Sequence, residues 1–252
     1  MGFIDVIKER AKAANKTIVL PETEDRRTYE AAAQILKEGI AKIILVGSEE
    51  AVKKGSEGLD LTGAVVVDPA TSDRTQAYID KLVELRQKKG MTPEQAKEIL
   101  LNQYLYYGVM MVKMGDADGM VSGACHSTAD TLRPCLQILK TKPGTKLVSA
   151  FFVIVVPDCD MGADGTFVFA DSGLEQNPDP EKLAAIALSS ADSFELLVEK
   201  EPIVAMLSHS TKGSAKHADV DKVVEATRIA KEQNPDLALD GEFQLCLLYT
   251  SP

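Results

Sequence analysis

Short apolar runs alternate with segments of helical periodicity along the first part of the chain. The runs TIVLP (17–21), AKIILVG (41–47) and AVVVDP (64–69) each end at a proline or a glycine, as buried strands commonly do. Residues 26–39 have apolar side chains at helical spacing and close on a glycine, and residues 72–89 predict a charged helix. This βα alternation predicts a parallel sheet covered by helices on both faces.

A capping box opens the next helix. Thr92 is followed by Pro93 at the first helical position and by Gln95, which completes a T-x-x-Q pattern. We expect this helix to continue through residues 100–114, before the strand-like segment DGMVSG (118–123).

In the second part of the chain, apolar runs again alternate with segments of helical periodicity. The apolar run 147–156 is too short to span a bilayer and predicts a buried strand. Further strands are expected at 166–173, 203–208 and 237–241, with helices at 180–198 and near 219–232. We therefore expect an α/β protein of two domains with parallel or mostly parallel sheets. The first domain is predicted at 1–145, with its boundary at KPGTK, and the second at 146–244.

Composition narrows the class of partner. The chain has 252 residues, 45% of them hydrophobic, and a formal net charge of −10. Such a charge argues against nucleic acid and anionic membranes as partners, whereas a local pocket for a small anion is compatible with it. No apolar targeting segment opens the chain, so a cytoplasmic protein is expected.

Cysteine and histidine spacing gives no sign of a metal site. The four cysteines show no C-x-x-C pattern and are expected to be reduced thiols. The three histidines lack H-x-x-x-H and H-E-x-x-H spacing, so we expect no bound metal. The acidic loop before Phe169 departs from the calcium-loop pattern, which excludes that interpretation.

The stretch SGACHSTADTLRP (122–134) is the first candidate site. Asp130 is expected to cap a helix, which would place Arg133 and Pro134 in its first turn. Free N–H groups at the helix start, together with a guanidinium, would suit an anion. The alternative is a well-capped helix whose Arg133 pairs with a surface carboxylate.

The loop SHSTKGSAK (208–216) is the second candidate. It follows a strand and gathers hydroxyls around Lys212 and Gly213, which suits phosphate. It is neither a Walker A loop nor a G-x-G-x-x-G fingerprint, and an ordinary βα loop is the alternative.

Two further residues have weaker signals. Arg86 precedes Gly90 at a predicted helix end, where a cation complements the helix dipole. Cys159 is a potential acyl acceptor, but no motif places an activating histidine beside it, which favours an incidental cysteine.

Five motifs taken together resemble the phosphate acetyltransferase family. The resemblance extends in order from about residue 2 to residue 244. The motifs are LPETEDRRT, DGMVSGACHSTADTLRP, VPDCDMGADGTFVFADSG, MLSHSTKGSAKH and DLALDGEFQ.

The resemblance implies an activity and an architecture. Acetyl-CoA and phosphate would be converted reversibly into acetyl phosphate and CoA, in acetate metabolism, with CoA as substrate and no bound cofactor. The fold would be similar to isocitrate and isopropylmalate dehydrogenases, with a cleft between the domains, and the full-length protein would be a homodimer.

The resemblance also assigns residues. Arg86 and Arg133 match arginines that bind substrate anions, which replaces the helix-end interpretation of Arg86. Arg133 would hold phosphate with Ser127 and Thr128, and Cys159 would lie near the cleft without acting as a nucleophile. The remaining substrate-binding residues are expected to be Ser210, Thr211, Lys212, Gly213 and Ser214.

Three alternatives remain open. A phosphate butyryltransferase would use the same chemistry on a larger acyl group. A decarboxylating dehydrogenase would need a nicotinamide and usually a cluster of metal-binding carboxylates, which is not evident here. A fragment that binds CoA or phosphate without catalysis is the third.

The last residues depart from the family pattern. Residues 245–252, LCLLYTSP, are expected to be a non-native tail on a truncated chain. The family's catalytic Ser-Arg pair and downstream Asp would lie in a further segment, so no catalytic residue is assigned, and we expect little activity from the chain alone.

Overall fold

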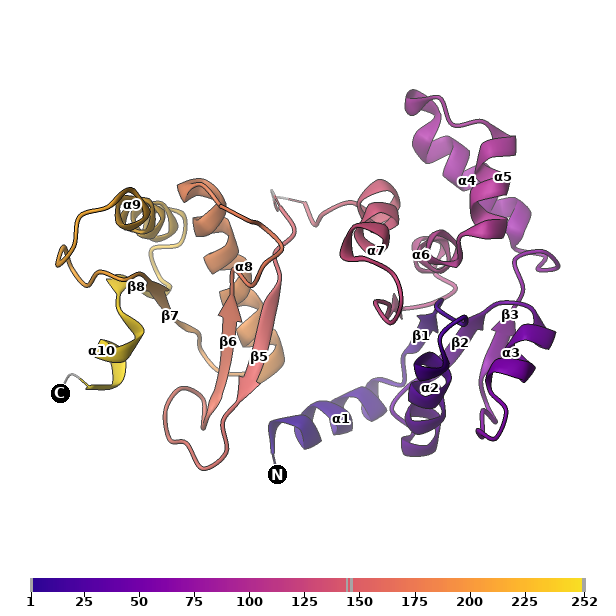
Figure 1. Cartoon of the computed structure of the whole chain (residues 1–252), viewed down its shortest axis with the longest axis horizontal. Coiled ribbons are helices and arrows are strands. Elements are labelled where there is room, and N and C mark those ends of the chain that lie inside the picture. The colour runs from indigo at the N-terminus through magenta and orange to yellow at the C-terminus, as the bar shows by residue number, and fades with distance from the viewer. Residues whose placement is uncertain (1, 144, 146, 251–252) are drawn as a thin grey trace. The chain divides into compact units, whose positions relative to one another are not determined.

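The computed structural model of the protein describes residues 2–143, 145 and 147–250. The chain divides into two units, Met1–Lys140 and Thr141–Pro252 (Figure 1). The predicted domain boundary falls beside Gly144 and Lys146, which lie outside the described residues. So do Ser251 and Pro252 of the predicted tail.

Four parallel strands form the sheet of the first unit, in the order β3-β2-β1-β4. They are β1 (Thr17–Leu20), β2 (Lys42–Val46), β3 (Val65–Val67) and β4 (Gly119–Met120). Since β1 and β4 are neighbours, the loops that follow them lie at the same edge of the sheet. The parallel sheet of the first unit is as predicted.

Helices cover both faces of this sheet. On one face, Ile43 and Leu45 pack with α2 (Arg26–Glu38) and α3 (Glu49–Gly55). On the other, Ile44 and Val46 pack with α4 (Thr75–Arg86), α5 (Pro93–Asn102) and α6 (Tyr104–Met114). The alternation along β2 explains why the strand is apolar throughout, because each face contacts its own helices. The remaining helices of this unit are α1 (Phe3–Ala14), α7 (Thr128–Pro134), and the short η1 (Gln87–Lys89) and η2 (Cys135–Leu139).

The predicted helix beginning at Thr92 is two helices. The Thr92–Gln95 capping box is present. Gln103, however, has φ −127° and ψ 91°, an extended conformation that ends α5 and begins α6. The direction of the chain changes there, so that α5 lies beside α4 (Figure 1) while α6 is buried from Leu105 to Met111.

The second unit has two small sheets. The strands β5 (Phe151–Val155) and β6 (Thr166–Ala170) are antiparallel, whereas β7 (Ile203–Leu207) and β8 (Ala238–Phe243) are parallel. Apolar residues of β7 and β8 form a core with α8 (Pro180–Val198) and α9 (Ala218–Gln233). The last described helix is α10 (Leu245–Thr250). Among the described residues, no helix is both long and apolar enough to cross a membrane.

Two expectations about the second unit are wrong. The sheet formed by β5 and β6 is not parallel, because a loop returns the chain directly into the neighbouring strand without a crossover helix. The run 147–156 is also not a buried strand: Phe152 is 62% exposed, and none of the five residues of β5 is fully buried. A two-stranded antiparallel ribbon can leave its side chains open to solvent even when its sequence is continuously apolar.

Candidate active site

The loop after β4 is held by a buried carboxylate from the loop after β1. Glu22 is 2% exposed, and its Oε2 accepts hydrogen bonds from the N–H groups of Gly123 at 2.6 Å and Ala124 at 2.7 Å. Its Oε1 accepts from the N–H groups of Cys125 at 3.1 Å and His126 at 2.9 Å. An anion was expected at the N–H groups of the helix start that follows this loop. The N–H groups of residues 123–126, within the loop itself, bind the Glu22 carboxylate.

Glu22 is ionised at neutral pH. Burial favours the neutral carboxyl, but the N–H groups of Ala124, Cys125 and Gly123, together with His126, outweigh it and hold the pKa of Glu22 well below its usual range. Burial and the carboxylates of Glu24 and Glu22 raise the pKa of the Cys125 thiol to about 12. Cys125 is therefore a protonated thiol, which is a poor nucleophile.

The helix that carries Arg133 begins earlier than predicted. Ser127, rather than Asp130, is the N-cap of α7: its Oγ accepts from the Asp130 N–H at 3.2 Å and donates to Asp130 Oδ2 at 2.7 Å. In S-x-x-D both residues are good caps, and the earlier one begins the helix. Arg133 consequently lies in the last turn of α7, so helix-start N–H groups do not assist it.

Arg133 and Arg86 act on the same buried tyrosine. Tyr106, on α6, is 8% exposed and donates a hydrogen bond to Gln137 Oε1 at 3.1 Å. Burial raises the pKa of Tyr106, and the positive charges of Arg133 and Arg86 oppose that rise. Both arginines therefore affect the ionisation of Tyr106. The helix that carries Arg86, α4, contacts η2, which directly follows the helix that carries Arg133.

Neither arginine is saturated by carboxylates. Arg133 is 56% exposed and contacts Asp130 at 3.5 Å, while Arg86 Nε is buried and has no hydrogen-bond partner among the described residues. Thr131 Oγ1, on the same helix as Arg133, is also buried and unpartnered within the described part of the chain. An orphaned buried donor is costly, and an anionic ligand would satisfy it.

The loop 208–214 is likewise closed by an internal carboxylate. Glu242, 3% exposed on β8, accepts from Ser210 Oγ at 2.9 Å and from the Gly213 N–H at 2.7 Å. Lys212 Nζ donates to both oxygens of Asp240 at 2.9 Å and to the Gly241 carbonyl at 2.8 Å.

The remaining hydroxyls of this loop also have internal partners. Ser214 Oγ accepts from the Thr211 N–H at 2.9 Å, and Thr211 Oγ1 accepts from the Gln244 N–H at 2.8 Å. The loop's polar groups thus stabilise its own conformation, and a role in binding substrate stays a prediction.

Cys159 lies in the loop between β5 and β6 and is half-buried. A Cβ on Gly165 would approach Cys159 Cβ to 3.3 Å and the Val156 carbonyl to 2.2 Å, so glycine permits this tight return of the chain. None of the hydrogen bonds among the described residues involves the Cys159 thiol, and nothing here activates it.

Three side chains of the kinds that bind metal ions lie close together. The donor atoms of Glu22, Cys125 and His126 lie within 4.8 Å of one another. His126 Nδ1 is 2.9 Å from Glu22 Oε1, and Cys125 Sγ is 3.6 Å from the same oxygen. That oxygen already accepts two backbone N–H groups, so hydrogen bonding alone satisfies the cluster.

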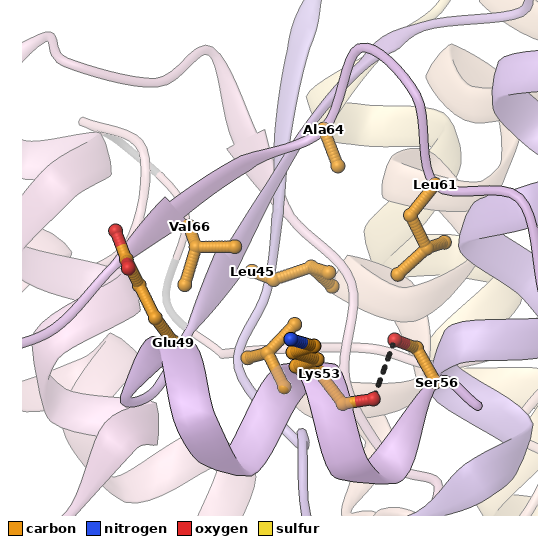
Figure 2. A pocket seen from close by; sticks show the side chains of 8 residues that line it. Leu45, Glu49, Lys53, Ser56, Leu61, Ala64 and Val66 are labelled. Atoms are coloured by element: carbon orange, nitrogen blue, oxygen red, sulfur yellow. Dashed lines mark hydrogen bonds between the residues drawn. The ribbon is translucent and has the colours of Figure 1, made fainter.

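A cavity of about 370 Å³ lies elsewhere in the first unit (Figure 2). Leu45 and Val66 of the sheet face Lys53 of α3 and Ser56, the residue that follows this helix, across it. Its lining includes no predicted site residue, and it lies on the face of the sheet opposite to α4 and α6.

Comparison with known proteins identifies the family. The family described as phosphate acetyl/butaryl transferase matches residues 2–247. The chain belongs to this family. The resemblance seen in its motifs is thereby confirmed.

Named relatives agree with this assignment. A phosphate acetyltransferase of Acetivibrio thermocellus is 55% identical over 245 residues, which cover 97% of this chain and 74% of the relative. One from Thermoanaerobacterium thermosaccharolyticum is 51% identical with the same coverage. Among solved structures, the EutD phosphotransacetylase from Staphylococcus aureus is 41% identical with a TM-score of 0.85, covering 96% of this chain and 72% of that one.

Three residues of the site were missed from the sequence. Glu22, Tyr106 and Glu242 are buried, and each contacts residues distant along the chain. The only local signal was that Glu22 and Glu242 lie within or just after strand-like runs, where a buried carboxylate needs donors from elsewhere.

Proposed function

We propose that this protein is a phosphate acetyltransferase, which interconverts acetyl-CoA and phosphate with acetyl phosphate and CoA. Family membership and relatives at 49–55% identity that are named phosphate acetyltransferase support this proposal. Both substrates are anions, and the net charge of −10 means that a local cationic site must attract them.

The observation that carries the proposal is the unsatisfied pair of arginines. Arg86 Nε is buried without a partner among the described residues, and the one carboxylate that Arg133 contacts in the described part of the chain is that of Asp130, at 3.5 Å in an exposed pair. A phosphoryl group between two guanidinium groups would be held by bidentate, charge-assisted hydrogen bonds. We infer that this group is the phosphate, or the phosphate end of acetyl phosphate.

The arginines would contribute to the reaction as well as to binding. In the direction of acetyl-CoA synthesis, the CoA thiolate attacks the carbonyl carbon of acetyl phosphate, a tetrahedral oxyanion forms, and phosphate leaves with the electron pair of the broken C–O bond. Positive charge fixed beside the phosphate stabilises the charge that develops on it and orients the carbonyl towards the thiolate. We assign the base that deprotonates CoA to no residue of this chain.

Several further properties remain predictions from the family resemblance. They are the interdomain cleft of a dehydrogenase-like architecture, the homodimer, the cytoplasmic location and the role in acetate metabolism. Substrate binding by Ser127, Thr128 and the loop 210–214 belongs with them.

The direct test is phosphate-dependent release of CoA from acetyl-CoA, followed with a thiol reagent at high protein concentration, because little turnover is expected from this chain alone. Release that saturates with phosphate supports the proposal, and a higher kcat/KM with butyryl-CoA would indicate a butyryltransferase instead. The Acetivibrio thermocellus relative is the positive control, both whole and cut to its matched region. If the cut relative works and this chain does not, the proposal fails.

A further inference from the structure

Glu22 connects the carboxyl ends of two neighbouring strands, β1 and β4, and binds the loop that leads into α7. We propose that Glu22 is a positioning residue, which fixes the loop 123–126 and through it the helix that carries Arg133. This inference rests on the proposed function, because it concerns the geometry of the phosphate-binding arginine. Glu22 itself would not touch the substrate.

The carboxylate binds the loop with both oxygens. Four consecutive backbone N–H groups, those of residues 123–126, point at one carboxylate with distances between 2.6 and 3.1 Å. His126 Nδ1 adds a fifth contact at 2.9 Å. Hydrogen bonds to a charged acceptor are stronger than those between neutral groups, so Glu22 contributes most of the side-chain hydrogen bonds that hold this loop.

The segment that carries Glu22 is itself anchored. Thr23 Oγ1 donates to the Val46 carbonyl at the end of β2, at 2.5 Å, and the buried Tyr29 hydroxyl donates to the Thr23 carbonyl at 2.5 Å. Arg27, which follows on α2, donates to the Ala124 carbonyl of the loop. The loop is therefore fixed to the sheet and to α2 rather than held by its own turns alone.

A continuous series of contacts leads from this loop to Arg133. His126 directly precedes Ser127, the N-cap of α7. Ser127 holds Asp130, and Asp130 lies 3.5 Å from the Arg133 guanidinium. The helix has only seven residues, so a shift at its first residue is transmitted to Arg133 rather than absorbed along its length.

The negative charge of Glu22 also bears on what binds here. The four N–H groups would otherwise form a concave anion site of their own. With Glu22 in place, these N–H groups already donate hydrogen bonds to its carboxylate, so the arginines are the groups that bind phosphate. Removing Glu22 should both release the loop and offer a competing anion site, and either change misplaces phosphate relative to Arg133.

The test uses Glu22→Gln and Glu22→Ala in the full chain. Asp118→Asn is the matched control, because Asp118 connects the same two strands at their other end: its Oδ2 accepts from the Thr17 N–H at 2.9 Å, next to β4. Phosphate affinity is measured by isothermal titration calorimetry at a temperature where every variant is folded. Hydrogen exchange at the amides of residues 123–126 is measured on the same samples.

The expected result is a rise in the phosphate Kd of roughly tenfold or more for Glu22→Ala, with a smaller rise for Glu22→Gln, which keeps one acceptor oxygen. Amide exchange at 123–126 should accelerate in both variants. Asp118→Asn should leave both quantities unchanged, whatever it does to the melting temperature.

Three outcomes would overturn the inference, and they are distinguishable. If the Glu22 variants bind phosphate as tightly as the unmodified chain while Arg133→Ala does not, Glu22 is merely structural and the proposed phosphate site stands. If the unmodified chain binds no phosphate at all, the proposed site fails and the positioning role fails with it. Unchanged amide exchange in Glu22→Ala would show that Glu22 does not hold the loop.

Discussion

The Ser210 hydroxyl donates a hydrogen bond of 2.9 Å to the Glu242 carboxylate, and both side chains are buried. Glu242 comes from β8, the parallel neighbour of the strand that leads into the Ser210 loop. Glu22 has the same relationship to the loop after β4 in the first unit. In each unit, the loop that was predicted as an anion site from its sequence is bound instead by a glutamate, which comes from the end of the neighbouring strand.

Glu242→Gln should destabilise the second unit by about 1–3 kcal/mol, because one amide cannot replace a charged acceptor of both the Ser210 hydroxyl and the Gly213 N–H. Urea unfolding followed by circular dichroism measures the change. Glu225→Gln is the control: Glu225 pairs with Arg228 on an exposed part of α9, where ion pairs contribute little. Equal effects of the two substitutions would contradict a special role for Glu242.

Arg133→Ala and Arg86→Ala should each raise the apparent KM for phosphate about tenfold or more, because each removes a bidentate donor to the phosphoryl group. Arg86→Lys should not restore it, since an ammonium lacks the Nε–H donor that is buried here. The measurement is CoA release at varied phosphate, with Arg228→Ala, an exposed helix arginine, as control. An unchanged KM in Arg133→Ala would remove Arg133 from the site.

The fold could be predicted where a local sequence pattern is compatible with only one local structure. The apolar runs of β1 and β2 are continuous because helices cover both faces of their sheet, and the Thr92 capping box is a purely local arrangement. The break at Gln103 could not be predicted, because apolar residues continue at helical spacing across it. The exposure of Phe152 was missed for a similar reason: a continuous apolar run does not say whether one or both faces are covered.

The site was less predictable than the fold. Ser127 and Asp130 are both good caps, three residues apart, and only the structure shows which begins the helix. The partners of Glu22 lie about a hundred residues away along the chain, so no local pattern reveals them. The effect of Arg86 and Arg133 on the pKa of Tyr106 likewise depends on how α4, α6 and α7 pack.

Cys159→Ser should retain most of the turnover, because the proposed reaction transfers the acetyl group directly between CoA and phosphate. A steady-state assay of CoA release measures this, with Cys135→Ser, another half-buried cysteine, as the matched control. Near-complete loss in Cys159→Ser alone would favour a ping-pong route through an acyl-cysteine.

Treatment with EDTA should leave phosphate binding and turnover unchanged. Glu22, Cys125 and His126 have suitable donor atoms, but both carboxylate oxygens already accept backbone N–H groups and the thiol is protonated. Assays before and after dialysis against the chelator, with zinc added back, measure the effect. Loss of activity that zinc restores would show that this cluster holds a metal ion.

Lowering the pH should reveal the contribution of Glu22 to stability. Because its pKa in the folded protein is below the value of 4.5 that it has when unperturbed, its contribution is fully present above pH 4.5 and is lost as the pH falls further. The free energy of unfolding should therefore differ most between the unmodified chain and Glu22→Gln at neutral pH. The difference should shrink as the pH is lowered below 4.5, because the protonated carboxyl accepts fewer hydrogen bonds. Urea unfolding at a series of pH values tests this, and a difference that stays constant down to pH values where the chain unfolds would show that the Glu22 charge does not stabilise the loop.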